Sequence, residues 1–347
     1  MRKRPAFVIS GTSVAPGSRN TVHIPVSTLS DHTPVTLSAH VIHGRLDGPT
    51  IFVSAGIHGD EVIGVEIVRR LLRAKNLKSL RGTLIVVPIV NTFGFLNHSR
   101  YLPDRRDLNR CFPGSPNGSL ASRLAHIFMT EIVSHCTLGI DLHSAAINRM
   151  NLPQVRVSAN NGTTLKLARV FGAPVILTSA LRDGSLRQEA QQTGVDVLLY
   201  EAGEGMRFDE MSVRAGLAGI LRVLKEINML PKAGIARPKV ASLLCSNSYW
   251  LRAPAGGLLR MFKSEGDVVE QGDIVAAISD PFGDGEIEVA ATYGGIIVGR
   301  AVIPVVHEGD ALLHIAAVAS NDRAETAVDE LATQLEESAL FDEDEII

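Results

Sequence analysis

The chain has 347 residues, of which 45% are hydrophobic and 20% charged, and its formal net charge is −3. This length predicts about two domains with a sizeable core, and the apolar content excludes intrinsic disorder over most of the chain. The 3 scattered cysteines exclude a disulfide framework or a CxxC zinc module, and no apolar run reaches the ~20 residues of a membrane span. We therefore expect a cytoplasmic protein with no membrane partner.

Charge is unevenly distributed along the chain. Residues 321–347 hold ten acidic side chains against one arginine, a net charge of −9, which leaves +6 on the first 320 residues. A mildly basic body suits a small anionic substrate and is too weakly charged to predict a nucleic-acid partner.

The first predicted elements lie in an N-terminal β segment, 1–47, where alternating residues in 20–45 indicate antiparallel edge strands. From 48 to 232, apolar runs of strand length alternate with segments of helical period. The predicted strands are 50–55, 82–90, 137–142, 174–178 and 195–200, and the predicted helices are 62–75, 120–134, 163–171 and 212–227. This alternation predicts an α/β fold with a mostly parallel or mixed central sheet flanked by helices.

The helical period ends at a Pro- and Gly-rich segment, 231–238, which we interpret as a linker. Residues 239–319 are short β-like runs with a weak repeat, in which Ala-x-x-Gly-Gly at 253 and 291 leads to Glu-Gly-Asp at 265 and 308. Two similar halves predict a small all-β barrel or sandwich domain. The acidic tail, 320–347, predicts either a helix on Val328, Leu331 and Leu335 or a frayed, disordered end.

The sharpest candidate site is His58-Gly-Asp-Glu61, which directly follows an apolar strand and enters a helix. A spacing of three residues brings His58 and Glu61 to one side of a first helical turn, and imidazole with carboxylate suits Zn²⁺. The alternative is a polar helix start in which Glu61 only complements the helix dipole.

His143 lies at the carboxyl end of another predicted strand, and Asp141 precedes it on the same strand face. Because sites in open α/β sheets form beyond the carboxyl ends of strands, we expect His58, Glu61 and His143 to form a His₂Glu zinc site. Such a site holds one Zn²⁺ per chain and leaves a position open for water. Asp141 either orients the His143 imidazole or pairs with a neighbouring arginine.

A third strand end carries Glu201, whose carboxylate would emerge at the same rim as a general base and then acid for amide hydrolysis. Glu204, in the following loop, is the alternative. Strand ends hold side chains more rigidly than loops do, which favours Glu201.

The long loop 91–118 carries a cluster of basic and amide side chains: Arg100, Arg105, Arg106, Asn109 and Arg110. Arginine forks bind carboxylates by paired hydrogen bonds, and one arginine can stabilise the oxyanion of a scissile carbonyl. The alternative is a solvated basic loop. Arg149 and Arg156, downstream of His143, are further substrate-binding candidates that no motif supports.

Together these residues resemble the succinylglutamate desuccinylase/aspartoacylase family, zinc-dependent relatives of the metallocarboxypeptidases. The resemblance covers roughly 48–230 and rests on four motifs: Gly-Ile-His58-Gly-Asp-Glu61, Arg100-Tyr followed by Asp107-Leu-Asn109-Arg110, Asp141-Leu-His143, and Tyr-Glu201-Ala-Gly. It implies a zinc-carboxypeptidase-like fold, in which His58, Glu61 and His143 bind Zn²⁺.

The same resemblance implies roles for the remaining site residues. Glu201 would handle the protons, and Asn109 and Arg110 would hold the substrate carboxylate. Arg100 would polarise the scissile carbonyl, although it lies farther from Asn109 than in the family pattern, so Arg105 and Arg106 are alternatives for this role.

The C-terminal β region is similar to a biotinyl/lipoyl-type domain, with Gly266-Asp-Val-Val-Glu-Gln-Gly-Asp273 as its strongest signature. Carriers of that fold present a modified lysine, and the corresponding stretch 283–289 contains none. We therefore expect this region to shape the mouth of the site or to mediate oligomerisation.

The sequence thus predicts a zinc-dependent hydrolase that removes an acyl group from an N-acyl amino acid or similar small amide. Metal-activated water would attack the carbonyl, with Glu201 as base and acid. The alternatives are a metallocarboxypeptidase-type peptidase and a non-catalytic sensor of an anionic metabolite. The expected partner is a small anionic N-acyl substrate, and a homo-oligomer is left open.

Overall fold

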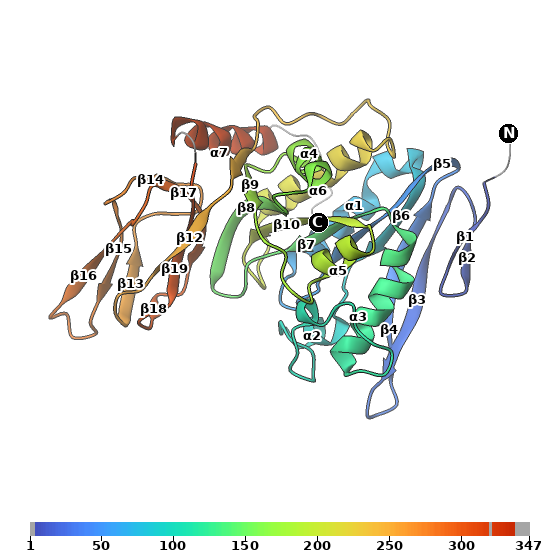
Figure 1. Ribbon diagram of the computed structural model, residues 1–347, viewed down its shortest axis with the longest axis horizontal. Helices are drawn as coiled ribbons and strands as arrows, with labels where there is room; N and C mark the ends of the chain where they lie inside the picture. The colour runs from blue at the N-terminus through green and yellow to red at the C-terminus, as the bar shows by residue number, and fades with distance from the viewer. Residues whose placement is uncertain (1–3, 319–320, 337–347) are drawn as a thin grey trace.

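The computed structural model describes residues 4–318 and 321–336 and is elongated (Figure 1). One large mixed sheet runs through the molecule with helices on both faces, and a smaller sheet lies at the end formed by the C-terminal strands. From edge to edge, the main path of the large sheet is β12 (Ser248–Arg252), β19 (Ala311–Ala316), β17 (Gly295–Ala301), β8 (Arg149–Val157), β10 (Asp196–Gly203), β7 (Leu138–His143), β5 (Leu46–Ala55), β6 (Arg81–Val87), β4 (Pro34–His43) and β3 (Ser18–Thr28). This architecture confirms the predicted α/β class with a mixed central sheet and additional β structure.

The centre of the large sheet is parallel, as its continuous apolar runs predict. β5 pairs in parallel with β6 and β7, and β7 pairs in parallel with β10. In this register Ser54 lies beside Asp141, and His143 lies beside Glu201. The carboxyl ends of β5, β7 and β10 therefore meet at one rim.

Helices cover both faces of the sheet and complete two hydrophobic cores. One face packs against α1 (Ile63–Arg73), α4 (Gly162–Phe171) and α6 (Glu210–Glu226), and the other against α3 (Leu120–Glu131) and α5 (Leu186–Gln192). α1 buries Ile63, Ile67 and Leu71, which recur every four residues on one face of the helix. The described chain also contains the short helix α2 (Thr92–Leu96) and 3-10 turns at Lys75–Ser79, Leu108–Arg110 and Val133–His135.

Gly139 of β7 lies directly beside Phe52 of β5, and a Cβ at position 139 would lie 2.1 Å from Phe52 Cζ. We expect Gly139→Ala to lower the free energy of unfolding by about 1–3 kcal/mol, the usual cost of overpacking a core. Urea denaturation would measure this loss. Gly162→Ala is a matched control, since nothing lies within 4 Å of a Cβ there, and its effect should stay within ~0.5 kcal/mol. Equal losses in both variants would contradict the packing argument.

Three elements of the central part were not predicted, namely β8, α5 and the short helix α2, which lies in the expected loop 91–118. β8 runs antiparallel to both β10 and β17, although its sequence contains Pro153 and two arginines rather than a continuous apolar run. α5 is short and largely polar, and it buries only Leu186 and Ala190. β8 and α5 are buried by neighbouring elements of the fold, and the hydrophobic periodicity of a segment does not predict burial of this kind.

The N-terminal segment contains the predicted edge strands, because β3 and β4 pair antiparallel at one edge of the sheet. It also contains a small hairpin that was not predicted, formed by β1 (Phe7–Ile9) and β2 (Thr12–Val14).

The C-terminal β region forms two sheets that share one core. The smaller sheet has the order β16 (Glu286–Ala290), β15 (Ile274–Ser279), β13 (Gly257–Met261) and β18 (Val305–Val306). It packs against β12, β17 and β19 of the large sheet through a shared hydrophobic cluster, so the region is a sandwich. β14 (Val268–Val269) pairs with β17.

The sequence repeat corresponds to a repeated turn. Asp267 accepts a hydrogen bond from the Ser264 amide at 2.8 Å, and Asp310 accepts one from the His307 amide at 2.9 Å. The same Asp-closed turn therefore precedes β14 in one half and β19 in the other.

Strand pairing connects the C-terminal region to the rest of the large sheet. β17 pairs with β8, and β11 (Leu243–Cys245) pairs with β9 (Val175–Thr178), which itself pairs with β8. The division into 1–47, 48–232, 239–319 and 320–347 stays a prediction, because hydrogen bonding is continuous across the expected linker.

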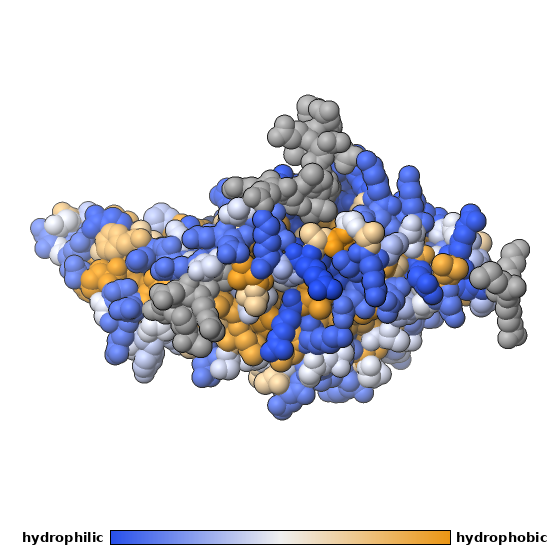
Figure 2. Space-filling view, turned by 90° about the horizontal axis from the view of Figure 1, so that it is seen from above, coloured by the Kyte–Doolittle hydropathy of each residue, from blue (hydrophilic) through white to orange (hydrophobic). Residues whose placement is uncertain are grey.

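Part of the acidic tail is a helix, α7 (Asn321–Glu336), which buries Leu331 and Leu335 and packs against α6. The rest of the predicted tail, 337–347, lies outside the described residues. Hydrophilic residues cover most of the face seen in Figure 2. Within the described ranges, no helix is long and apolar enough to cross a membrane.

Candidate metal centre and cavity

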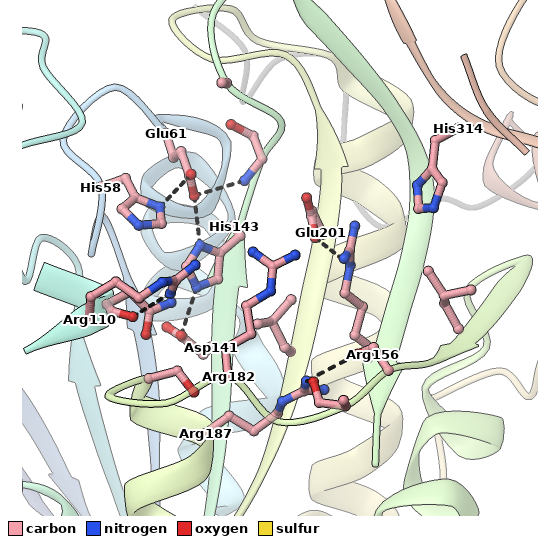
Figure 3. A pocket seen from close by; sticks show the side chains of 18 of the residues that line it. His58, Glu61, Arg110, Asp141, His143, Arg156, Arg182, Arg187, Glu201 and His314 are labelled. Carbon is pink, nitrogen blue, oxygen red and sulfur yellow. Dashed lines mark hydrogen bonds and ion pairs between the residues drawn. The ribbon is translucent and has the colours of Figure 1, made fainter. Parts of the chain in front are cut away.

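Three buried side chains converge at the carboxyl ends of β5 and β7. They are His58, Glu61 and His143, and one potential ligand atom from each lies within 4.8 Å of the others. Glu61 lies between the two imidazoles (Figure 3), with Oε1 2.6 Å from His58 Nδ1 and Oε2 2.8 Å from His143 Nδ1. The fold thus brings together the three residues of the predicted His₂Glu set.

His58 and Glu61 lie in a turn rather than in the predicted first helical turn. The Glu61 amide donates to the His58 carbonyl at 3.2 Å, and α1 begins only at Ile63. The turn passes directly against the short helix α2, because a Cβ at Gly59 would lie 1.9 Å from the carbonyl carbon of Gly94. Glycine at position 59 therefore permits the close approach that places both ligands.

The donor set suits a divalent metal ion such as Zn²⁺. Both imidazoles direct Nδ1 toward Glu61 and direct Nε2 toward a second carboxylate, Asp141 at 2.8 Å for His143 and Asp107 at 3.1 Å for His58. A carboxylate that accepts from Nε2–H fixes the tautomer whose lone pair lies on Nδ1. Two such nitrogens and one carboxylate fit a catalytic zinc site with an open position.

The ionisation of this cluster reflects strong mutual attraction in a buried pocket. Burial alone raises the pKa of Glu61, but the imidazoles of His58 and His143 outweigh burial and hold this pKa well below the usual carboxyl range. Burial alone lowers the pKa of His143, but Asp141 and Glu61 outweigh it and raise this pKa well above its ordinary value. Negative charge that binds protons this firmly also favours a cation at the same place.

Glu201, near the end of β10, lines the same cavity, which has a volume of about 400 Å³. Its Oε1 accepts a hydrogen bond from Asn151 Nδ2 at 2.8 Å. Its Oε2 lies 2.6 Å from Arg156 Nε, an ion pair seen in Figure 3. Parallel pairing places Glu201 next to His143, so both side chains project from the same face of the sheet.

Glu204, the alternative base, does not line this cavity. It is buried, accepts a hydrogen bond from the Asn148 amide at 3.0 Å, and pairs with Arg207 at 2.8 Å. Its carboxylate therefore stabilises the loop that follows β10.

The arginine-rich loop separates into residues that reach the cavity and residues that do not. Arg100, Asn109 and Arg110 line it, and Arg100 Nη1 lies 3.4 Å from Glu61 Oε1. Arg105 and Arg106 do not line it: Arg105 is exposed at a left-handed φ of 62°, and the Arg106 side chain is 60% exposed beside Asp104. The loop therefore places Arg105 and Arg106 away from the cavity, and their expected substrate contacts stay a prediction.

Two cavity arginines were missed at the sequence level, Arg182 and Arg187, and Arg156 was named without motif support. Within residues 4–318 and 321–336, Arg110, Arg182 and Arg187 form no ion pair with a carboxylate. Burial, together with the charges of Arg156 and Arg182, lowers the pKa of Arg187 to about 10. Arginines outnumber carboxylates in the lining of this cavity, and an excess of positive charge favours an anionic ligand.

The C-terminal strands complete the cavity with Ser248, Trp250 and His314, which sequence reasoning also missed. His314 stacks on Trp250 with ring centroids 4.4 Å apart, and its Nε2 lies 2.8 Å from Ser248 Oγ. Burial and the charge of Arg156 lower the pKa of His314 to about 3, so its imidazole is neutral. No motif marks these residues, because strand pairing alone brings them to the site. These residues make the region part of the cavity wall, and its expected role at the mouth of the site stays a prediction.

Comparisons with known proteins identify the family and support the fold. Residues 47–227 match the family of the succinylglutamate desuccinylase/aspartoacylase catalytic domain. The chain is 27% identical over 286 residues to the N-alpha-acetyl-L-2,4-diaminobutyric acid deacetylase of Halomonas elongata, a match that covers 79% of this chain and 84% of that protein.

Two solved structures share the fold over most of their length. A succinylglutamate desuccinylase/aspartoacylase from Rhodobacter sphaeroides has a TM-score of 0.78 at 25% identity, covering 86% of this chain and 96% of its own. The ectoine utilization protein EutE (DoeB) from Ruegeria pomeroyi, solved with product bound, has a TM-score of 0.77 at 23% identity, covering 87% and 95% respectively.

Proposed function

Because the chain belongs to the succinylglutamate desuccinylase/aspartoacylase family, we propose that it is a zinc-dependent hydrolase that removes the acyl group from a small N-acyl amino acid. The family is one of deacylases, and the Halomonas relative is by name a deacetylase of an N-acetylated amino acid. The observation that carries the proposal is the convergence of His58, Glu61 and His143 in one cavity with Glu201.

In this proposal His58, Glu61 and His143 hold the metal. A bound Zn²⁺ would lower the pKa of a water molecule and polarise the acyl carbonyl. Glu201 takes one proton from water and returns it to the nitrogen of the amine as the carbon–nitrogen bond breaks. The products are a free carboxylic acid, which gains the hydroxyl of water, and a free amine.

The cavity arginines and Asn109 orient the substrate in this proposal. Arg100, whose Nη1 lies 3.4 Å from Glu61 Oε1, would stabilise negative charge on the carbonyl oxygen. Asn109 and Arg110 hold the carboxylate of the amino acid, and Arg182 and Arg187 add positive charge to the same cavity. An anionic N-acyl amino acid therefore matches the charge of the site.

Amine release from a panel of N-acetyl, N-succinyl and N-formyl amino acids tests the proposal. We expect turnover with Zn²⁺, loss of turnover after treatment with a chelator, and recovery when Zn²⁺ is added back. Absence of turnover on every amide, with zinc bound stoichiometrically, would overturn it.

Asp141 is expected to control metal affinity through His143. Its Oδ2 lies 2.8 Å from His143 Nε2, and its Oδ1 accepts from the Ser54 hydroxyl at 2.8 Å. Because a neutral amide supports the imidazole less well than a carboxylate, Asp141→Asn should weaken Zn²⁺ binding by about 10- to 100-fold. Competition with a fluorescent chelator measures this affinity, and the exposed Asp183 offers Asp183→Asn as the control. An unchanged affinity in Asp141→Asn would contradict the expected role.

A further inference from the structure

The Glu201 carboxylate is held by two residues of the neighbouring strand β8. Asn151 Nδ2 donates to Oε1 at 2.8 Å, and Arg156 Nε lies 2.6 Å from Oε2. Asn151 is only 7% exposed, so few other hydrogen-bond partners are within reach of its amide. The position of Glu201 thus depends on where β8 places the Asn151 side chain.

On its other side, Asn151 faces the C-terminal strand β17. Gly299 of β17 is its direct cross-strand partner, and a Cβ at Gly299 would lie 2.4 Å from Asn151 Oδ1. Gly299 has no left-handed φ, so its backbone conformation would accept another residue. Position 299 requires glycine because the Asn151 amide occupies the space that a side chain there would need.

We propose that Gly299 is a positioning residue for the general base, acting through Asn151. Because Gly299 has no side chain, the Asn151 amide fits directly against it. In this position Oδ1 lies against Gly299, and Nδ2 donates a hydrogen bond to Glu201. The C-terminal β region, which contributes β17, thereby takes part in catalysis as well as in forming the cavity wall. This inference rests on the proposed role of Glu201.

A methyl group at position 299, as in Gly299→Ala, would displace the Asn151 amide. The nearest atom, Asn151 Oδ1, is the far end of a flexible side chain, and the next is the backbone oxygen of Met150 at 3.3 Å, which needs only a small shift. Asn151 therefore rotates away while the strands stay paired. Rotation of the amide moves Nδ2 with Oδ1 and removes the hydrogen bond to Glu201. Glu201 then samples orientations in which it cannot reach the water and the leaving nitrogen together.

The test is a double-mutant cycle on zinc-loaded enzyme with the best substrate of the N-acyl panel. Gly299→Ala and Asn151→Ala should each lower kcat by about 10- to 100-fold, with KM and zinc content little changed. The double variant should be no slower than Asn151→Ala alone, because both changes remove the same hydrogen bond. Gly256→Ala, in the same β region, is the matched control, since a Cβ there meets nothing closer than 3.5 Å.

Each alternative outcome has a distinct meaning. Additive losses in the double variant, or a loss in KM rather than kcat, would overturn the positioning role and leave Gly299 a structural residue. If the wild type hydrolyses no amide, the proposed function fails, and crystal structures still test the positioning. An unchanged bond between Asn151 Nδ2 and Glu201 Oε1 in Gly299→Ala would overturn it, whereas a broken bond would support it.

Discussion

Replacement of Glu201 by glutamine is expected to lower kcat for deacylation by about 10³-fold, the scale of a lost general acid–base group. Glutamine keeps the size and the acceptor that faces Asn151, but it can neither take a proton from water nor return one to the amine. Glu201 lines the cavity without being one of the three converging candidate ligands, so zinc content should be unchanged. Steady-state kinetics combined with metal analysis measures both quantities.

Glu204→Gln is the control that decides between the two carboxylates. Glu204 lies outside the cavity lining, where it pairs with Arg207 and the Asn148 amide. We expect its kcat to stay within about threefold of wild type. A large loss in Glu204→Gln with an active Glu201→Gln would reassign the base to the loop after β10.

Replacement of His143 by alanine is expected to remove zinc binding and activity together. His143 supplies one of only two imidazoles in the cluster, and its side chain is buried between Glu61 and Asp141. Two remaining ligands bind Zn²⁺ far more weakly than three, so zinc content after dialysis should fall from about one per chain to about a tenth or less. Turnover should fall below detection, and neither should recover at micromolar zinc.

The control for this change is a histidine away from the cluster. His98 is exposed at a left-handed φ of 50°, a conformation that asparagine tolerates. His98→Asn should retain full zinc content and full activity. Stoichiometric zinc in His143→Ala would show that the metal binds elsewhere.

The central sheet was predictable because its strands are apolar on both faces. A run such as Ile51–Ala55 has no polar alternation, which identifies a strand covered on both sides. β8 was not predictable in the same way, because its proline and arginines obscure the pattern and its burial depends on β10 and β17. Antiparallel insertion of β8 is a property of the assembled sheet.

The candidate metal ligands were also accessible from the sequence, since each follows directly from a strand end. His58 and Glu61 come after β5, and His143 ends β7, so the rim of a parallel sheet is where they must meet. The same logic selected Glu201 at the end of β10. This reasoning could not tell which arginines of the long loop reach the cavity. Arg100 and Arg110 line it, whereas Arg105 and Arg106 are exposed to solvent.

The sequence by itself therefore determined the fold class and the residues at the strand ends, because these depend on local periodicity and short-range spacing, and its motifs carried the resemblance to the family. Only the tertiary structure decided the rest of the cavity. Arg182, Trp250 and His314 come from separate loops and strands, and the fit of Gly299 against Asn151 exists only after β17 has paired with β8. Contacts between segments far apart in the chain are fixed by strand pairing and core packing, which leave no local pattern in the residues they bring together.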